Sequence, residues 1–432
     1  MTLIGFAFII INGIALLLLP RRWACLPLLV GSCYISQGQK IAVGPIHFSV
    51  IRSLILVGFV RGVLRRELTT LGLVGCDWAV LGWGTWLVAA SVFHNPPGDT
   101  FVTYLGVAYN CVGIYLLIRS FCRSKEDAAN FVFITCILLG PLSLEMMQEK
   151  VTGRNLFAVL GGVSEEVVIR DGKLRAQGPF GHAILAGTVG ASCVPLMFGI
   201  WRSNPMAARL GVAAAMAMMW ACTSSGPIMT FALGAFAVGL WPLRMYTRKL
   251  CMLAVVCYMV LDLVMKRPGY FILAKIDITG SSTGWHRAEL IRSARQHLGE
   301  WWFAGTDYTR HWMPTGVYFS PNHADITNQY IQYGVYGGLF LISLFMLQLW
   351  LAFTYVGRMV NGARALDKDG AWFVWCLGSS LFAHAVTCIS VSYYDQSSVF
   401  MFAALAVISS MYSSSPNPSL DAEAIENRLL EV

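Results

Sequence analysis

Charged side chains are scarce in this sequence, at 12% of its 432 residues, whereas a soluble domain typically carries about 25%. Hydrophobic residues make up 56% of the chain, and the mean hydropathy is +0.61. So little charge excludes an ordinary water-soluble domain, and no nucleic-acid partner is expected. The chain is predicted to be an all-α polytopic membrane protein.

Apolar runs of roughly 17–25 residues, long enough to cross a bilayer as a helix, recur along the whole chain. They predict about twelve or thirteen transmembrane helices. The first run lacks a basic leader and a small-residue cleavage site, so it is expected to be a retained helix rather than a signal peptide. The predicted spans are 2–19, 23–36, 48–63, 73–93, 100–119, 127–146, 182–201, 208–222, 226–242, 250–265, 327–356, 371–393 and 396–412.

Paired cysteine motifs are missing as well. The twelve cysteines lie in or beside apolar runs, and no CxxC pair occurs, which predicts neither a disulfide framework nor a zinc site. The long loops described next contain no DxD cluster for a divalent ion. No metal site and no cofactor are therefore expected.

Lysine and arginine clusters alternate along the chain with nearly uncharged turns. Because cytoplasmic loops are enriched in these residues, the clusters are predicted to face the cytoplasm. Two long connections then lie on the outer side. The resulting division is N-terminal helices 1–146, first outer loop 147–181, central helices 182–265, second outer loop 266–326, C-terminal helices 327–412 and a cytoplasmic tail 413–432.

The second outer loop contains a predicted helix, SSTGWHRAELIRSARQHLG (281–299), with Ser or Thr available as N-cap and Gly299 as its end. Arg287 falls within its apolar stripe, whereas Arg292 and Arg295 fall outside it. Two interpretations of Arg287 are open. It pairs with a carboxylate such as Glu166 or Asp325, or it faces a cavity and grips phosphate with both ends of its guanidinium.

The first outer loop ends in RAQGPFGHAILAG (175–187), at the start of a membrane helix. Gly178 and Gly181 allow sharp turns, and a helix beginning near His182 offers amide donors and a positive dipole end. Together with Arg175 these features predict an anion site. The alternative is a glycine-rich turn whose arginine side chain extends to the membrane surface and binds no ligand.

Polar residues crowd the start of one of the longest apolar runs, SPNHADITNQYIQYGVYGG (320–338). Such a polar start is typical of a helix that lines a watery cavity. His323 leads it, and a histidine with a pKa near neutrality suits a general base. A purely structural histidine is the alternative.

These three elements, in this order, resemble the O-antigen ligase and O-antigen polymerase superfamily of bacterial envelope enzymes. Its pattern is an arginine followed by glycine and an aromatic residue at a helix mouth, then an arginine that opens a loop helix leading to a glycine turn, then a histidine before a helix with two glycines three residues apart. The resemblance covers about 175–338, and its residues here are Arg175, Gly178, Phe180, Arg287, Gly305, His323, Gly334 and Gly337.

The resemblance implies a metal-independent glycosyltransferase, suspected to have a GT-C-like architecture, on the outer face of the cytoplasmic membrane. It would transfer a polyprenyl-pyrophosphate-linked glycan to a hydroxyl, with polymerisation of exopolysaccharide or O-antigen repeats preferred over ligation. Polysaccharide export or chain-length control proteins would be further partners. His323 is the expected base, and Arg175, Arg287, Gly178, His182 and Arg292 the expected substrate-binding residues.

A transporter or lipid flippase is the alternative from another class. The carboxylates within its apolar runs would then couple ions or substrate, since such residues are usually functional. These carboxylates are Asp77, Glu145 and Asp262.

Overall fold

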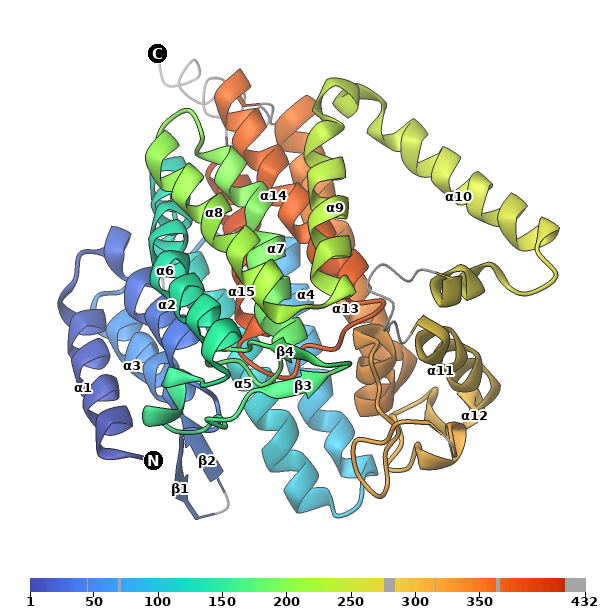
Figure 1. Cartoon of the computed structure of the whole chain (residues 1–432). Coiled ribbons are helices and arrows are strands. Elements are labelled where there is room, and N and C mark those ends of the chain that lie inside the picture. Colours follow the sequence, from blue (N-terminus) through green and yellow to red (C-terminus); the bar gives the residue numbers. More distant parts are fainter. Residues whose placement is uncertain (45, 69–70, 276–283, 315, 363–365, 416–432) are drawn as a thin grey trace, which may run out of the picture.

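The computed structural model is built almost entirely of helices (Figure 1) and describes every residue except 45, 69–70, 276–283, 315, 363–365 and 416–432. The helices are α1 Leu3–Leu18, α2 Cys25–Tyr34, α3 Val50–Leu64, α4 Gly75–Ala90, α5 Pro97–Phe121, α6 Lys125–Thr152, α7 Ala183–Gly199, α8 Pro205–Cys222, α9 Ser225–Gly239, α10 Thr247–Val264, α11 Gly284–Gln296, α12 Leu298–Trp301, α13 Gln329–Asn361, α14 Lys368–Thr387 and α15 Ser397–Ser414. Two short antiparallel hairpins are formed by β1 Lys40–Val43 with β2 Ile46–Ser49, and by β3 Val168–Arg170 with β4 Lys173–Arg175.

The prediction of an all-α chain is confirmed, and each of the predicted spans coincides with one helix. Within the described residues, six helices are long and apolar enough to cross a membrane: α4 with the short turn after it, α5, α6, α8, α13 and α15. Helices α1, α7 and α9 are shorter apolar helices, and α2, with ten residues, is too short to span by itself. The chain is thus a multi-pass membrane protein, and the figure of twelve or thirteen spans stays a prediction.

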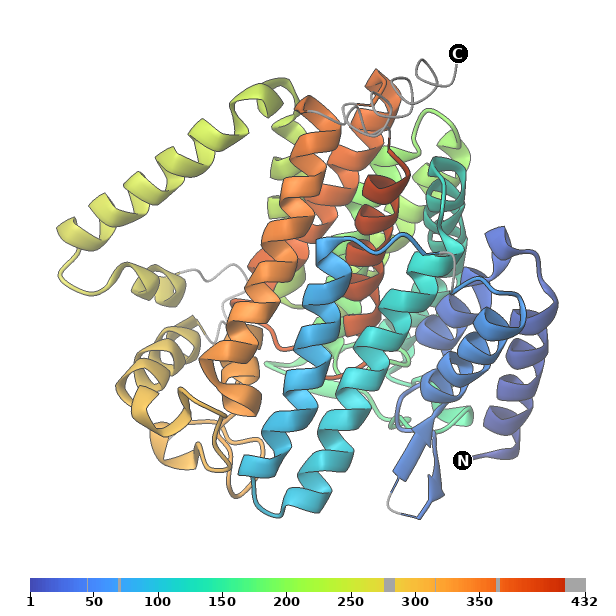
Figure 2. The same ribbon diagram turned by 180° about the vertical axis from the view of Figure 1, so that it is seen from behind.

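The helices pack into one bundle around α15 (Figures 1 and 2). Helix α15 contacts α5, α13 and α14, and 83% of its 18 residues are buried inside the structure. On one side α6, α7 and α8 pack together and α14 lies against α7 and α9; on the other, α4 lies against α5 and α13. Helix α10 stands away from the bundle and has no buried residue.

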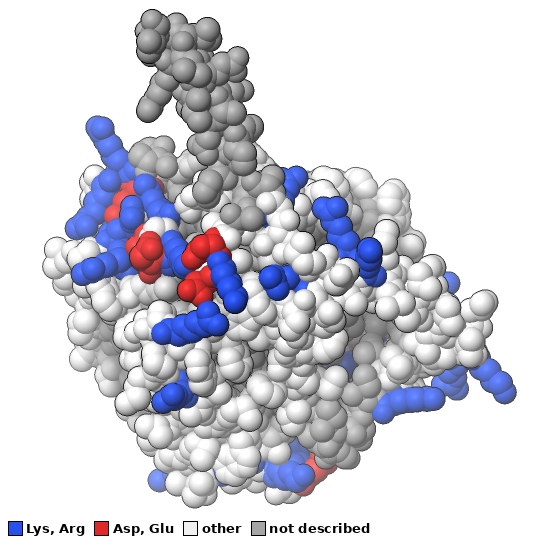
Figure 3. Space-filling view, turned by 90° about the horizontal axis from the view of Figure 1, so that it is seen from above, with Lys and Arg blue, Asp and Glu red and all other residues white. Residues whose placement is uncertain are grey.

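The basic clusters gather at one end of the bundle, which Figure 3 shows face-on. Ion pairs join them across the connections: Arg21 with Asp127, Lys125 with Asp367, and Arg202 with Asp369. The hairpin β3–β4 and helices α11 and α12, which belong to the two long loops, lie toward the opposite end (Figure 1). The structure therefore separates the basic clusters from the long loops, as the charge pattern predicts.

Two buried arginines hold the basic end together. The guanidinium of Arg61 donates to both carboxylate oxygens of Glu67, at 2.8 and 2.9 Å. That of Arg119 donates to both oxygens of Asp77, at 3.1 and 3.2 Å. Burial of an arginine is costly without such a partner, so these two ion pairs stabilise the basic end of the bundle.

The helix of the second loop differs in detail from its prediction. Helix α11 ends at Gln296, and Gly299 lies inside the following short helix α12, because the chain bends at His297 before it reaches the glycine. The Ser and Thr residues expected to cap the helix, and the tail beyond Ser415, lie outside the described residues.

Candidate functional site

Arg175 ends strand β4 and is only 5% exposed. Its Nε donates to the carbonyl oxygen of Cys222, at the end of α8, over a long 3.4 Å. Burial lowers the pKa of its guanidinium, and the positive charge of Arg170 on β3 lowers it further. No carboxylate forms an ion pair with Arg175 within the part of the chain that the structure describes. The hairpin β3–β4 therefore holds the positive charge of Arg170 close to that of the buried Arg175.

Gly178 forms the predicted sharp turn, with φ of +57°. The amides beside this turn are occupied by the protein's own side chains. The carboxylate of Glu149 on α6 accepts from the amides of Gln177 and Gly178, at 3.0 and 2.7 Å. Asp395, just before α15, accepts from the amide of Gly181 at 2.8 Å. These loop amides are therefore not free, and the anion site predicted at the start of α7 stays a prediction.

His182 is the N-cap of α7, and its Nδ1 accepts from the amide of Ile184 at 3.1 Å. Because a backbone amide always donates, the ring proton of neutral His182 must sit on Nε2. Burial, helped by the charges of Arg175 and Arg170, lowers the pKa of His182 to about 4. Near neutral pH the residue is therefore an uncharged hydrogen-bond donor beside two cations.

This depressed pKa predicts a pH dependence of stability. The pKa of His182 is near 6.5 in the unfolded chain and about 4 in the native one, so acidification from pH 6.5 to 4 protonates the unfolded state first and removes stability. His182→Asn keeps an N-cap acceptor but does not titrate. Thermal unfolding of both proteins in detergent should show the wild type losing on the order of 2 kcal/mol more than the variant over this interval. Parallel pH profiles would contradict the assigned protonation state.

Arg287 lies in the first turns of α11 and is partly buried. Its Nε is enclosed and has no hydrogen-bond partner among the residues that the structure describes. Burial lowers the pKa of the guanidinium, Arg170 lowers it further, and Asp325 acts in the opposite direction. Asp325 is therefore near, but neither it nor Glu166 forms an ion pair with Arg287 in the described chain.

Arg292 lies elsewhere on the same helix in a different environment. Its side chain is 50% exposed and pairs with Glu289 at 2.6 Å. Surface pairs of this kind contribute little to stability. The structure thus separates the two arginines of α11 into an enclosed one, Arg287, and an exposed, paired one.

His323 follows a tight turn in which its amide donates to the carbonyl oxygen of Ser320 at 3.2 Å. Its Nδ1 lies 3.2 Å from the hydroxyl oxygen of Thr309. Burial lowers the pKa of His323; Asp307 opposes this shift and His94 adds to it. The ring is therefore neutral near pH 7, the state that a general base needs.

The partner of His323 restricts where its proton lies. Thr309 is fully buried, and its hydroxyl oxygen already accepts from the amide of Ala324 at 3.1 Å. Its hydroxyl hydrogen is satisfied if it is donated to Nδ1 of His323, which puts the ring proton on Nε2. The opposite tautomer leaves a buried hydroxyl hydrogen unpaired, at about 1–3 kcal/mol. At rest, His323 thus presents an Nε2–H to its surroundings.

His94 and Asp307 join this group, and neither was predicted. Nε2 of His94 faces the carbonyl oxygens of Ala304 and Tyr336, at 2.9 and 3.2 Å, and its Nδ1 faces Asp307 at 2.5 Å. The ring of His94 is thus held from both sides by oxygen atoms. The turn HNPPGD (94–99) is one of the nearly uncharged connections between apolar runs; the histidine that opens it was the available signal.

The two groups meet at the segment 323–325. His286, beside Arg287 on α11, donates from Nε2 to the carbonyl oxygen of Asp325 at 2.9 Å. Helix α11, which carries Arg287, therefore contacts the segment that carries His323. The arginine group is Arg170, Arg175, His182 and Arg287; the histidine group is His94, Asp307, Thr309 and His323.

Glycines fasten the second loop to α13, which breaks at Gly337 and Gly338. A Cβ on Gly334 would lie 2.5 Å from the ring of Trp301, and one on Gly338 only 2.1 Å from the carbonyl oxygen of Phe303. The close packing at Gly334 and Gly338 is thus with the second loop rather than with another long helix.

Comparison with known proteins adds no relative. No protein-family model matches the chain, and no curated protein is significantly similar to it.

Proposed function

We propose that this protein is a glycosyltransferase of the cytoplasmic membrane that transfers a polyprenyl-pyrophosphate-linked glycan to a hydroxyl acceptor on the outer face, polymerising repeat units of an envelope polysaccharide. The orientation rests on the positive-inside rule: the end that carries the basic clusters faces the cytoplasm. The end with the two long loops then faces outward, and the arginine and histidine groups belong to it. A GT-C-like architecture is part of the same proposal.

The observation that carries the proposal is the pair of enclosed arginines without carboxylates. The buried Arg61 and Arg119 each have a two-pronged carboxylate partner, whereas the partly buried Arg310 is held by backbone carbonyl oxygens. Arg175 and Arg287 have none in the described chain, Nε of Arg287 lacks any acceptor, and Arg170 adds charge to both. Arginine side chains without carboxylate partners are suited to bind an anionic ligand, whose oxygen atoms supply the missing hydrogen-bond acceptors.

A lipid pyrophosphate fits that requirement. Its charge would be balanced by the arginines, which stabilise the departing group without a metal ion. The neutral His182, with its proton on Nε2, would add a donor that does not compete for charge. Apolar helices beside the site would accommodate the polyprenyl chain.

His323 is proposed to remove the proton of the attacking hydroxyl. For this the ring must shift its own proton to Nδ1, next to Thr309, so that Nε2 can accept. Phosphate charge nearby would favour the protonated ring that results. Thr309 is then a positioning residue, because it acts through His323.

The transporter alternative is less well supported, because its three carboxylates have structural partners. Asp77 is paired with Arg119. Asp262 accepts from the amide of Gly269 at 2.6 Å, and Glu145 from the amide of Leu156 at 2.9 Å. The pairing of Asp77 and the cap made by Asp262 do not resemble a coupling site, whereas Oε2 of Glu145 is buried without a hydrogen-bond partner among the described residues.

The proposal is tested by the glycans that cells make without the protein. Deletion should leave lipid-linked single repeats and no long chains, and the purified protein should convert such repeats into longer glycans. Accumulation of finished but unattached chains would instead indicate a ligase. Normal chains in the deletion strain, with no product from the purified protein, would reject both transfer reactions.

A further inference from the structure

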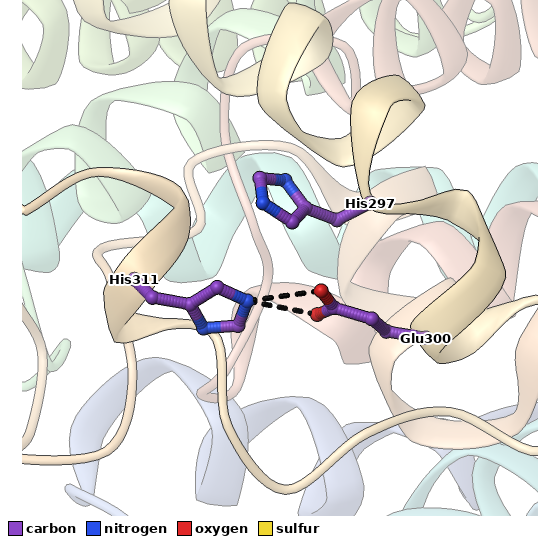
Figure 4. A group of neighbouring side chains, drawn as sticks. All are labelled: His297, Glu300 and His311. Carbon is purple, nitrogen blue, oxygen red and sulfur yellow. Dashed lines mark hydrogen bonds and ion pairs between the residues drawn. The ribbon is translucent and has the colours of Figure 1, made fainter.

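Three side chains of the second loop converge outside the arginine and histidine groups (Figure 4). They are His297, between α11 and α12; Glu300, in α12; and His311, in the short helix η6 Arg310–Trp312. One ligand-type atom from each lies within 4.8 Å of the other two. Nε2 of His311 is 2.9 and 3.1 Å from the two carboxylate oxygens of Glu300.

The surroundings orient all three side chains. Nδ1 of His297 faces the carbonyl oxygen of Ser293 at 2.9 Å, so its proton lies there and Nε2 keeps a lone pair. Glu300 accepts from the indole Nε1 of Trp312 at 3.1 Å. Rings of Trp312 and Tyr308 stack on His297 and His311, respectively. Outer hydrogen bonds that fix the tautomer of a histidine and the position of a carboxylate are typical of metal ligands.

We propose that His297, Glu300 and His311 form a binding site for a divalent ion of the zinc type. Two imidazoles and one carboxylate are a ligand set that Zn²⁺ accepts, with a fourth position left for water. Ligand atoms around tetrahedral zinc lie about 3.3 Å apart, given bond lengths of about 2.0–2.1 Å. His311 and Glu300 already lie within this spacing, at 2.9 Å, and the ligand atom of His297 lies within 4.8 Å of both. Binding of the ion would displace the proton that lies between Nε2 of His311 and the carboxylate of Glu300.

The site is separate from the proposed transfer chemistry. His297 lies ten positions beyond Arg287, about 15 Å along the axis of α11 at 1.5 Å per residue. The ion would instead connect the end of α11 to η6, whose N-cap is Thr309. It would thereby tie the helix that carries Arg287 to the segment that positions His323. Cysteine spacing could not indicate this site, because no cysteine takes part.

Zinc uptake by the purified full-length protein tests the inference. Protein in detergent is stripped with chelator, incubated with Zn²⁺ and desalted, and bound metal is measured by mass spectrometry. The wild type should retain about one zinc ion per chain and melt a few degrees higher with zinc than without. His297→Ala, Glu300→Gln and His311→Ala should each lose both effects. Cobalt should give the visible absorption of four-coordinate Co²⁺ in the wild type alone.

The matched control is His47→Ala, which removes an exposed histidine on β2 and should leave zinc uptake unchanged. Gel filtration confirms that each variant is folded. Wild-type protein that holds no stoichiometric zinc, or triad variants that hold as much as wild type, would overturn the inference. Transfer activity need not be present for any of these measurements, so the result stands apart from the proposed function.

Discussion

Replacing Arg287 by lysine should lower the rate of glycan transfer by roughly 10²–10³, the usual effect of removing one donor that stabilises developing charge. Lysine keeps the positive charge but loses the planar fork, which offers donors in two directions at once. The enclosed Nε, without a partner at present, is the donor that disappears. The rate is measured with purified protein and a lipid-linked repeat as substrate, with saturation by donor followed separately.

Arg295→Lys is the matched control, since Arg295 lies on the same helix and is exposed. It should transfer at the wild-type rate. Both variants should unfold at the wild-type temperature, because Arg287 has no ion pair to lose. If Arg287→Lys instead stays fully active and Arg287→Ala merely destabilises the protein, the guanidinium is structural and the pyrophosphate proposal fails.

Loss of the His323 ring should be the second large effect. His323→Ala should lower transfer by roughly 10²–10⁴, the range for a missing general base, with little change in melting temperature, because the ring is only half-buried. Wild-type activity should also persist into mildly acidic solution, since burial lowers the pKa of His323 below its usual value. The rate is followed from pH 8 to pH 5.

Thr309 separates positioning from catalysis in this experiment. Thr309→Ser retains the hydroxyl partner of Nδ1 and should behave like the wild type. Thr309→Val removes it and should alter the pH profile more than the affinity for the donor. A stable and fully active His323→Ala protein would leave the histidine a structural residue and would remove the base from the mechanism.

The helices could be predicted because a membrane helix is specified by local hydrophobicity: every run of apolar residues became one helix. The positions of Arg175, Arg287 and His323 on the long loops were accessible for the same reason, since charge and polarity stand out against apolar surroundings. The enclosed state of Arg287 followed from its place in the apolar stripe of α11. Its lack of an ion pair did not, because Asp325 was an equally reasonable partner.

What escaped prediction depends on contacts between distant segments. Glu149 of α6 and Asp395, just before α15, accept hydrogen bonds from the amides of the first loop. No local sequence pattern predicts these contacts. His94 reaches Asp307 across 213 positions. The contacts of Glu149, Asp395 and His94 are set by tertiary packing, which a single sequence does not display.

Glycines pack the second loop closely against α13, and this contact affects where the sequence of the loop can vary. Thr306 donates its amide to the carbonyl oxygen of Val335 at 3.0 Å, and Leu339 donates to that of Trp302 at 2.8 Å. The stretch from Thr306 to Val335 therefore leaves and re-enters the bundle at one point, like a closed surface loop. Exposed parts of this stretch can be lengthened while the membrane helices keep their register. Acceptor preference can then change through such insertions, with His323 and the arginines of the donor site left in place.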